Sequence, residues 1–71
     1  MRFISGAVYR HKNCLDIDLE VKKVQYRSPD YTKLRVIYLN RNWQNGFFVI
    51  DPRPETVKIK SSDYWLWERI R

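Results

Sequence analysis

Residues 15–21 read Leu-Asp-Ile-Asp-Leu-Glu-Val, so apolar and acidic side chains alternate along this stretch. Successive side chains of an extended strand point to opposite faces, which gathers the apolar residues on one face. A helix would instead scatter them around its axis. The stretch therefore predicts a β-strand with one face buried in a core and the other face open.

The open face of this strand has three carboxylates, those of Asp16, Asp18 and Glu20. Asp16 and Asp18 are close enough to suggest a pair of catalytic carboxylates, but nothing in the sequence indicates a pocket around them. Opposite charges on a neighbouring strand commonly compensate such a row. We expect these side chains to be solvated and compensated across strands, with no catalytic role.

The alternation breaks at Lys22-Lys23 and resumes in the opposite phase at Val24 and Tyr26. One extra residue in a strand produces this change of phase. The sequence therefore predicts a β-bulge or a sharp bend near Lys22, within a long second strand.

Further short strands are predicted over residues 6–10, 33–39, 47–50 and 56–60, where β-branched and aromatic residues favour extended structure. Turn-forming residues separate these stretches at 27–30, 40–46 and 51–54. Residues 61–63 form a short connector with the character of a 3₁₀ turn. Residues 64–70 form either a strand or a short helix. Alternation favours the strand, in which Trp65 and Trp67 share a face.

Five or six short antiparallel strands without an amphipathic helix predict a single all-β domain over residues 1–71. Closure into a barrel would protect the sheet edges of so short a chain. The layout resembles small SH3-like barrels of the KOW, Tudor or chromo-like kind, through residues 6–12, the bent strand 15–26, the hairpin after it and the connector 61–63. An OB-type barrel is the nearest alternative, although OB folds are usually longer and include a helix.

Positive charge dominates the chain, which has 14 Lys and Arg against eight Asp and Glu, for a net charge of +6. Folding does not require this excess, so we expect an acidic partner. Cys14 is the only cysteine, which excludes an internal disulfide and suits a reducing cytoplasm. The sequence has no apolar stretch of the length of a membrane span or a secretory signal, so we expect a cytoplasmic protein without membrane contact.

Aromatic and basic residues alternate in several places, as at Tyr9-Arg10 and Tyr26-Arg27. Single-stranded nucleic acid needs this combination, because bases stack on rings while cations neutralise phosphates. We therefore predict nucleic-acid binding, to DNA or RNA, with little sequence selectivity. The predicted phosphate contacts are Arg10, Lys12, Lys22, Lys23, Arg27, Lys33, Arg35 and Arg41. The predicted ring surfaces are Tyr9, Tyr26 and Trp43, with Trp65 or Trp67 as further candidates.

Two other hypotheses fit the same composition. One is a protein-interaction module that docks an acidic or extended partner segment, anchored by Trp43 in its asparagine-rich loop. The alternative, which the need of a small core for apolar volume favours slightly, is that Trp43 folds back to plug one end of the barrel. The other hypothesis is an accessory subunit of a larger assembly.

Enzymatic chemistry finds little support in the sequence. His11 and Cys14 stand three residues apart and together supply half of a zinc site, but the chain has no further His or Cys to complete four ligands. A Cys–His nucleophile also needs an orienting group and an oxyanion hole, neither of which is indicated. We expect no metal, cofactor, small-molecule substrate or catalytic activity.

Overall fold

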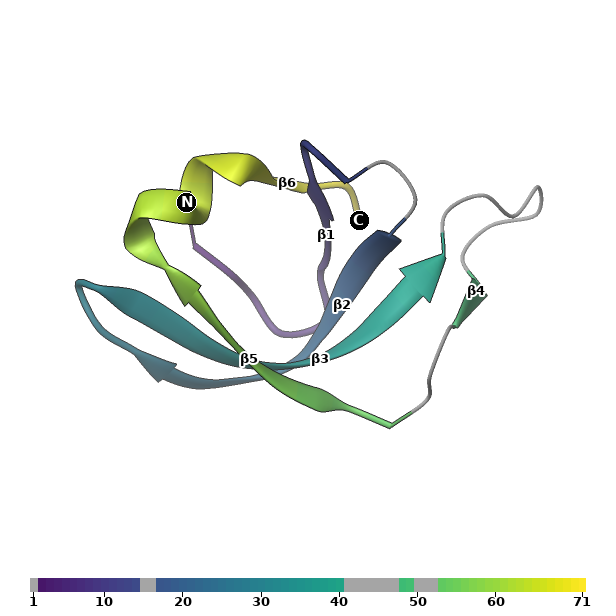
Figure 1. The fold of residues 1–71 in the computed structure, drawn as a ribbon. Helices are drawn as coiled ribbons and strands as arrows, with labels where there is room; N and C mark the ends of the chain where they lie inside the picture. Colours follow the sequence, from purple (N-terminus) through teal and green to yellow (C-terminus); the bar gives the residue numbers. More distant parts are fainter. Residues whose placement is uncertain (1, 15–16, 41–47, 50–52) are drawn as a thin grey trace.

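The computed structural model describes residues 2–14, 17–40, 48–49 and 53–71. Within these residues the chain forms an antiparallel sheet of six strands and a 3₁₀ helix, η1 (Figure 1). The elements are β1 (Val8–His11), β2 (Ile17–Arg27), β3 (Tyr31–Asn40), β4 (Phe48–Val49), β5 (Glu55–Lys60), η1 (Ser61–Leu66) and β6 (Trp67–Arg69). The prediction of an all-β chain with antiparallel strands is confirmed.

The two long strands, β2 and β3, organise the sheet. The start of β2 pairs with β1, which in turn pairs with β6, while β3 pairs with both β4 and β5. Figure 1 shows β1, β6 and η1 arching over the concave side of β2, β3 and β5. The core lies inside this curve, and the convex side of β2, β3 and β5 is the outer face of the sheet.

Strand β2 contains two register shifts against β3. Val21 lies opposite Val36 and Lys23 opposite Arg35, so Lys22 is an extra residue. This confirms the irregularity predicted near Lys22. A second shift lies between Val24 and Tyr26, where the sequence had suggested plain alternation.

The core consists of alternate residues on the inner face. Leu19 and Val21 of β2 are buried, as predicted from their alternation, and Leu34 and Val36 of β3 are buried beside them. Ile59 of β5 completes this layer. The intervening residues of β3, Lys33 and Arg35, are exposed on the outer face.

An aromatic cluster covers the core on the side of β1 and η1. Phe3 is buried, and its ring centroid lies 4.7 Å from that of Tyr9, 5.7 Å from that of Tyr64 and 6.3 Å from that of Trp67. These edge-to-face contacts are of the kind that aromatic rings favour. The Tyr9 hydroxyl accepts a hydrogen bond from the Ile4 amide at 2.9 Å and donates to the Arg2 carbonyl at 3.2 Å. The N-terminal segment is therefore fixed to the sheet by Phe3 and Tyr9.

The prediction that residues 64–70 form one strand is wrong for its first half. Residues Ser61–Leu66 form η1, and only Trp67–Arg69 are extended. Side chains three residues apart lie on the same side of a 3₁₀ helix. Tyr64 and Trp67 therefore both pack against the core, whereas Trp65 is 66% exposed and does not share a face with Trp67.

The described part of the chain contains no helix with the length and apolar character needed to cross a bilayer.

Replacing Phe3 with Ala should lower the free energy of unfolding by about 3–5 kcal/mol, because it removes a buried ring together with its aromatic contacts. Urea titration of this variant measures the loss. The control is Ile4→Ala at the adjacent position, which is 45% exposed and where we expect a cost below about 1 kcal/mol. Equal costs for the two variants would contradict the assignment of Phe3 to the core.

Candidate nucleic-acid interface

The outer face of β2, β3 and β5 gathers basic side chains with two tyrosines. Residues that lie directly opposite each other in antiparallel strands point to the same side of a sheet. The register therefore places Lys23 beside Arg35, and Lys33 between Tyr26 and Lys58. Tyr31 lies beside Lys60 on the same side. We call this surface the basic face and define it by Lys23, Lys33, Arg35, Lys58, Lys60, Tyr26 and Tyr31.

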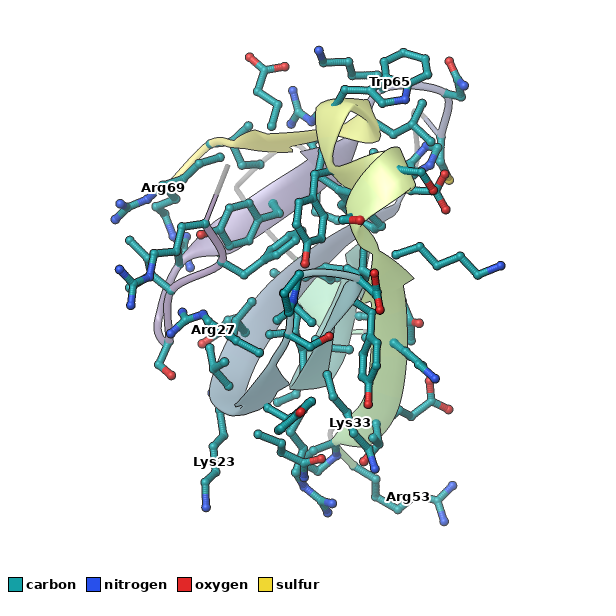
Figure 2. All side chains as sticks on the ribbon, turned by 90° about the vertical axis from the view of Figure 1, so that its left-hand side faces the viewer. Lys23, Arg27, Lys33, Arg53, Trp65 and Arg69 are labelled. Carbon is teal, nitrogen blue, oxygen red and sulfur yellow. The ribbon has the colours of Figure 1, made fainter. Side chains whose placement is uncertain are left out.

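Figure 2 shows how the basic face lies relative to the rest of the molecule. Lys23 and Lys33 project from the side of the sheet that lies away from η1. Trp65 lies at the opposite end of the view, on η1. The surface that presents the lysines is thus separate from the surface that exposes the tryptophan.

The two tyrosines of the basic face contact each other and a lysine. The ring centroids of Tyr26 and Tyr31 lie 5.6 Å apart, and the Lys58 ammonium lies 4.1 Å from the centroid of Tyr31. A cation over an aromatic face is attracted by the ring quadrupole. Tyr31 is half-buried by these contacts, whereas Tyr26 is 53% exposed.

The cations of the basic face repel one another. Lys23 lies opposite Arg35 and Lys33 opposite Lys58, and like charges in directly opposite positions destabilise a sheet. Among the described residues, Lys23, Lys33, Arg35, Lys58 and Lys60 form no ion pair with a carboxylate. An external anion would remove this repulsion, so the face is electrostatically suited to a polyanion.

Other predicted phosphate contacts are compensated within the chain. The Arg10 Nε lies 3.2 Å from the Asp18 Oδ1, and Arg10 is also opposite Glu68 of β6. The Lys22 Nζ lies 3.0 Å from a carboxylate oxygen of Glu20. The expected cross-strand compensation of the acidic row is therefore confirmed for Asp18, while Glu20 is paired within its own strand.

The expectation that Asp18 is solvated is wrong, because the residue has no exposed surface. Burial disfavours the charged carboxylate and raises the pKa of Asp18 above its ordinary value of 3.8. Attraction to the Arg10 guanidinium and the hydrogen bond from it act in the opposite direction but do not cancel the effect of burial. Alternation alone could not reveal this burial, since it shows which face a residue is on and not what covers that face.

Three more of the predicted residues lie off the basic face. Arg27 lies opposite Thr32, which is buried on the core side, and donates a hydrogen bond from Nη2 to the Phe3 carbonyl. Lys12 is exposed in the turn after β1, where its amide bonds the Leu66 carbonyl beneath η1. The prediction that Tyr9 presents a ring to a ligand is wrong, because only 1% of Tyr9 is exposed and the ring packs on Phe3.

Two predicted residues, Arg41 and Trp43, lie outside the described residues. Three members of the basic face were not among the predicted contacts, namely Tyr31, Lys58 and Lys60. Alternation over residues 56–60 was visible in the sequence and indicated that the two lysines share one side. The pairing of β5 with β3 was not visible, and this pairing is what brings them beside Lys33 and Tyr31.

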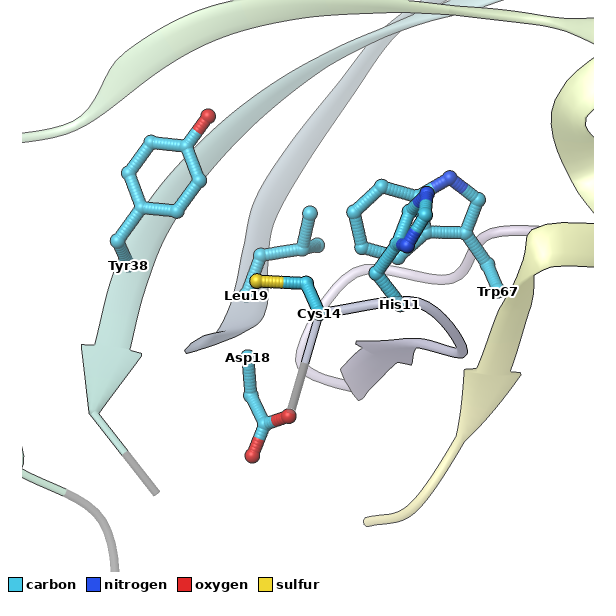
Figure 3. Close-up of a pocket in the computed structure, with 6 residues that line it drawn as sticks. All are labelled: His11, Cys14, Asp18, Leu19, Tyr38 and Trp67. Atoms are coloured by element: carbon cyan, nitrogen blue, oxygen red, sulfur yellow. The ribbon is translucent and has the colours of Figure 1, made fainter. Parts of the chain in front are cut away.

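A cavity of about 260 Å³ lies on the concave side, away from the basic face. His11 and Trp67 line one side of it, Tyr38 lies across from them, and Leu19 and Cys14 lie between (Figure 3). The His11 and Trp67 rings are perpendicular, with centroids 5.0 Å apart. Within the described part of the chain, no three His, Cys, Asp or Glu side chains are grouped to hold a metal ion.

Neither a known protein family, nor a curated protein, nor a solved structure matches this chain.

The raised pKa of Asp18 predicts a specific dependence of stability on pH. The folded state holds this proton more tightly than the unfolded chain does, so protonation of Asp18 favours folding. Its contribution is complete below pH 3.8 and is lost as pH rises through the folded pKa. The difference in unfolding free energy between the wild type and Asp18→Asn should therefore fall with rising pH. Urea titrations over a pH series measure it, and a difference that rises with pH would contradict the assignment.

Proposed function

We propose that this protein binds nucleic acid through the basic face. The observation that supports this most strongly is the cluster of five cations on the outer face, none of them paired with a carboxylate among the described residues. Phosphates of a nucleic-acid backbone supply the regularly repeated negative charge that such a surface lacks. Contacts to phosphate convey no sequence information, so binding should have little sequence selectivity.

We also propose that the fold is a small barrel of the SH3-like kind, in a single domain. Its support is the connectivity, in which the last strand, β6, pairs with the first strand, β1, after a 3₁₀ turn. Return of the final strand to the first is the arrangement that closure of a sheet requires. The barrel would bend β2 and β3 so that their convex side presents the basic face.

Binding of a labelled oligonucleotide should weaken steeply with salt. Neutralising five phosphates gives a slope of log affinity against log salt of about −3.5 to −4.5, at about 0.7 to 0.9 for each phosphate. Fluorescence anisotropy between about 50 and 200 mM salt measures this slope. Absence of binding at the lower salt concentration, or binding that does not respond to salt, would remove the proposal.

A second experiment separates the effect on binding of where the charges lie from the effect of net charge. The double substitution of Lys33 and Lys58 with Gln should weaken binding about tenfold or more and reduce the slope by about 1.4 to 1.8, because two phosphate contacts are lost. The matched control replaces Arg2 and Lys12, which are exposed and lie off the basic face, and removes the same charge. We expect the control to change affinity less than about threefold. Equal losses in the two variants would show that net charge, and not this face, determines binding.

A protein-interaction function is the second candidate, and the exposure of Trp65 favours it. Exposed aromatic side chains are common anchors in protein interfaces. Trp65 lies on η1, away from the basic face, so such a partner would leave the lysines free (Figure 2). If nucleic-acid binding is the function, Trp65→Ala should leave oligonucleotide affinity unchanged.

A further inference from the structure

We infer that the basic face binds single strands in preference to duplexes, with a base stacked on Tyr26. This inference rests on the proposed function and specifies its ligand. It depends on the position of Tyr26, the most exposed ring of the basic face at 53% exposure, and on the bulge that places it there.

The second bulge of β2 turns Tyr26 outward. Val24 lies opposite Leu34 on the core side, and regular alternation would put Tyr26 on the same side as Val24. The extra residue Gln25 reverses the phase, so Tyr26 lies opposite Lys33 on the outer face. Bulges commonly re-aim a side chain in this way next to functional sites. A large ring is thereby removed from a small core that needs apolar volume and is placed among cations.

The neighbours of Tyr26 support its ring and leave much of it uncovered. Tyr31 lies 5.6 Å away, and its own ring is held by Lys58 at 4.1 Å. Tyr31 is half-buried in these contacts, so the more open ring of the pair is that of Tyr26. Lys33 lies directly opposite Tyr26 on the same side of the sheet, so it is positioned to bind the phosphate that accompanies a stacked base.

Duplex and single strand differ in what they present to such a surface. Both have phosphates, so Lys23, Lys33, Arg35 and Lys58 would attract either form. The bases of a duplex are stacked on each other, and their faces are closed to a side chain on a sheet. Only an unpaired base exposes a π-face, and stacking on an aromatic side chain tolerates any base. Tyr26 would therefore contribute to affinity for single strands and contribute little for duplexes.

The test compares a fluorescein-labelled oligothymidylate with a blunt-ended duplex of two annealed strands that has the same total number of phosphates, by anisotropy at one salt concentration. Wild-type protein should bind the single strand more tightly. Tyr26→Ile, which keeps strand propensity and removes the ring, should weaken single-strand binding about tenfold and duplex binding less than threefold. Tyr26→Phe keeps the ring and should bind like the wild type. Trp65→Ile removes an exposed ring off the basic face and should change neither affinity.

The outcomes separate the inference from the proposed function. Equal affinity for the two forms, tighter binding of the duplex, or equal weakening of both by Tyr26→Ile would overturn the inference and leave nucleic-acid binding in place. Failure of the wild type to bind either form would overturn both. Competition by polyglutamate as effective as that by unlabelled oligothymidylate would also overturn both, since the face would then recognise acidic protein.

Discussion

A sheet of this size cannot bury both of its faces along its whole length, and the other features of the structure depend on this limit. A chain of about 60 to 70 residues removes only about 60% of its unfolded surface from water. The inner face of β2, β3 and β5 takes the available apolar side chains, with Leu34, Val36 and Ile59 at its centre. Phe3 of the N-terminal segment and Tyr9 of β1 cover these side chains. Over the basic face the outer side of the sheet is exposed and polar, whereas Asp18 and Leu39 at its other end are buried.

A mixture of positive and negative side chains would be enough to make the outer face polar. The structure instead distributes the positive and negative side chains unevenly. Carboxylates lie beside arginine or lysine at the β1 end of the sheet, as in the pairs of Arg10 with Asp18 and of Lys22 with Glu20. On the basic face, cations lie opposite cations, at a cost in stability that an external polyanion would relieve. Segregation of charge and the outward bulge at Gln25 are both unfavourable locally. Such local conflicts commonly mark functional surfaces.

Much of this arrangement was predictable from local pattern. Period-two alternation predicted the burial of Leu19 and Val21, because successive side chains of a strand point to opposite faces. The break in this alternation predicted the irregularity at Lys22. Long-range pairing was not predictable from the local pattern, so the placement of Lys58 and Lys60 beside β3 is seen only in the folded structure. The strand prediction for residues 64–70 was wrong in its first half. The positions of Tyr64 and Trp67 in the sequence are compatible with both a 3₁₀ turn and a strand, and only the backbone hydrogen bonds distinguish the two. The burial of Tyr9 and Asp18 depended on what packs over them, which no local pattern contains.

The central claim is that the outer face of β2, β3 and β5 is the ligand surface. Amide resonances of labelled protein, followed by NMR during titration with an oligonucleotide at low salt, test it most directly. The account predicts that the largest shifts fall on Lys23, Tyr26, Lys33 and Lys58, with the Trp65 indole unmoved. Largest shifts on η1, or on the residues around the cavity at His11 and Trp67, would contradict it.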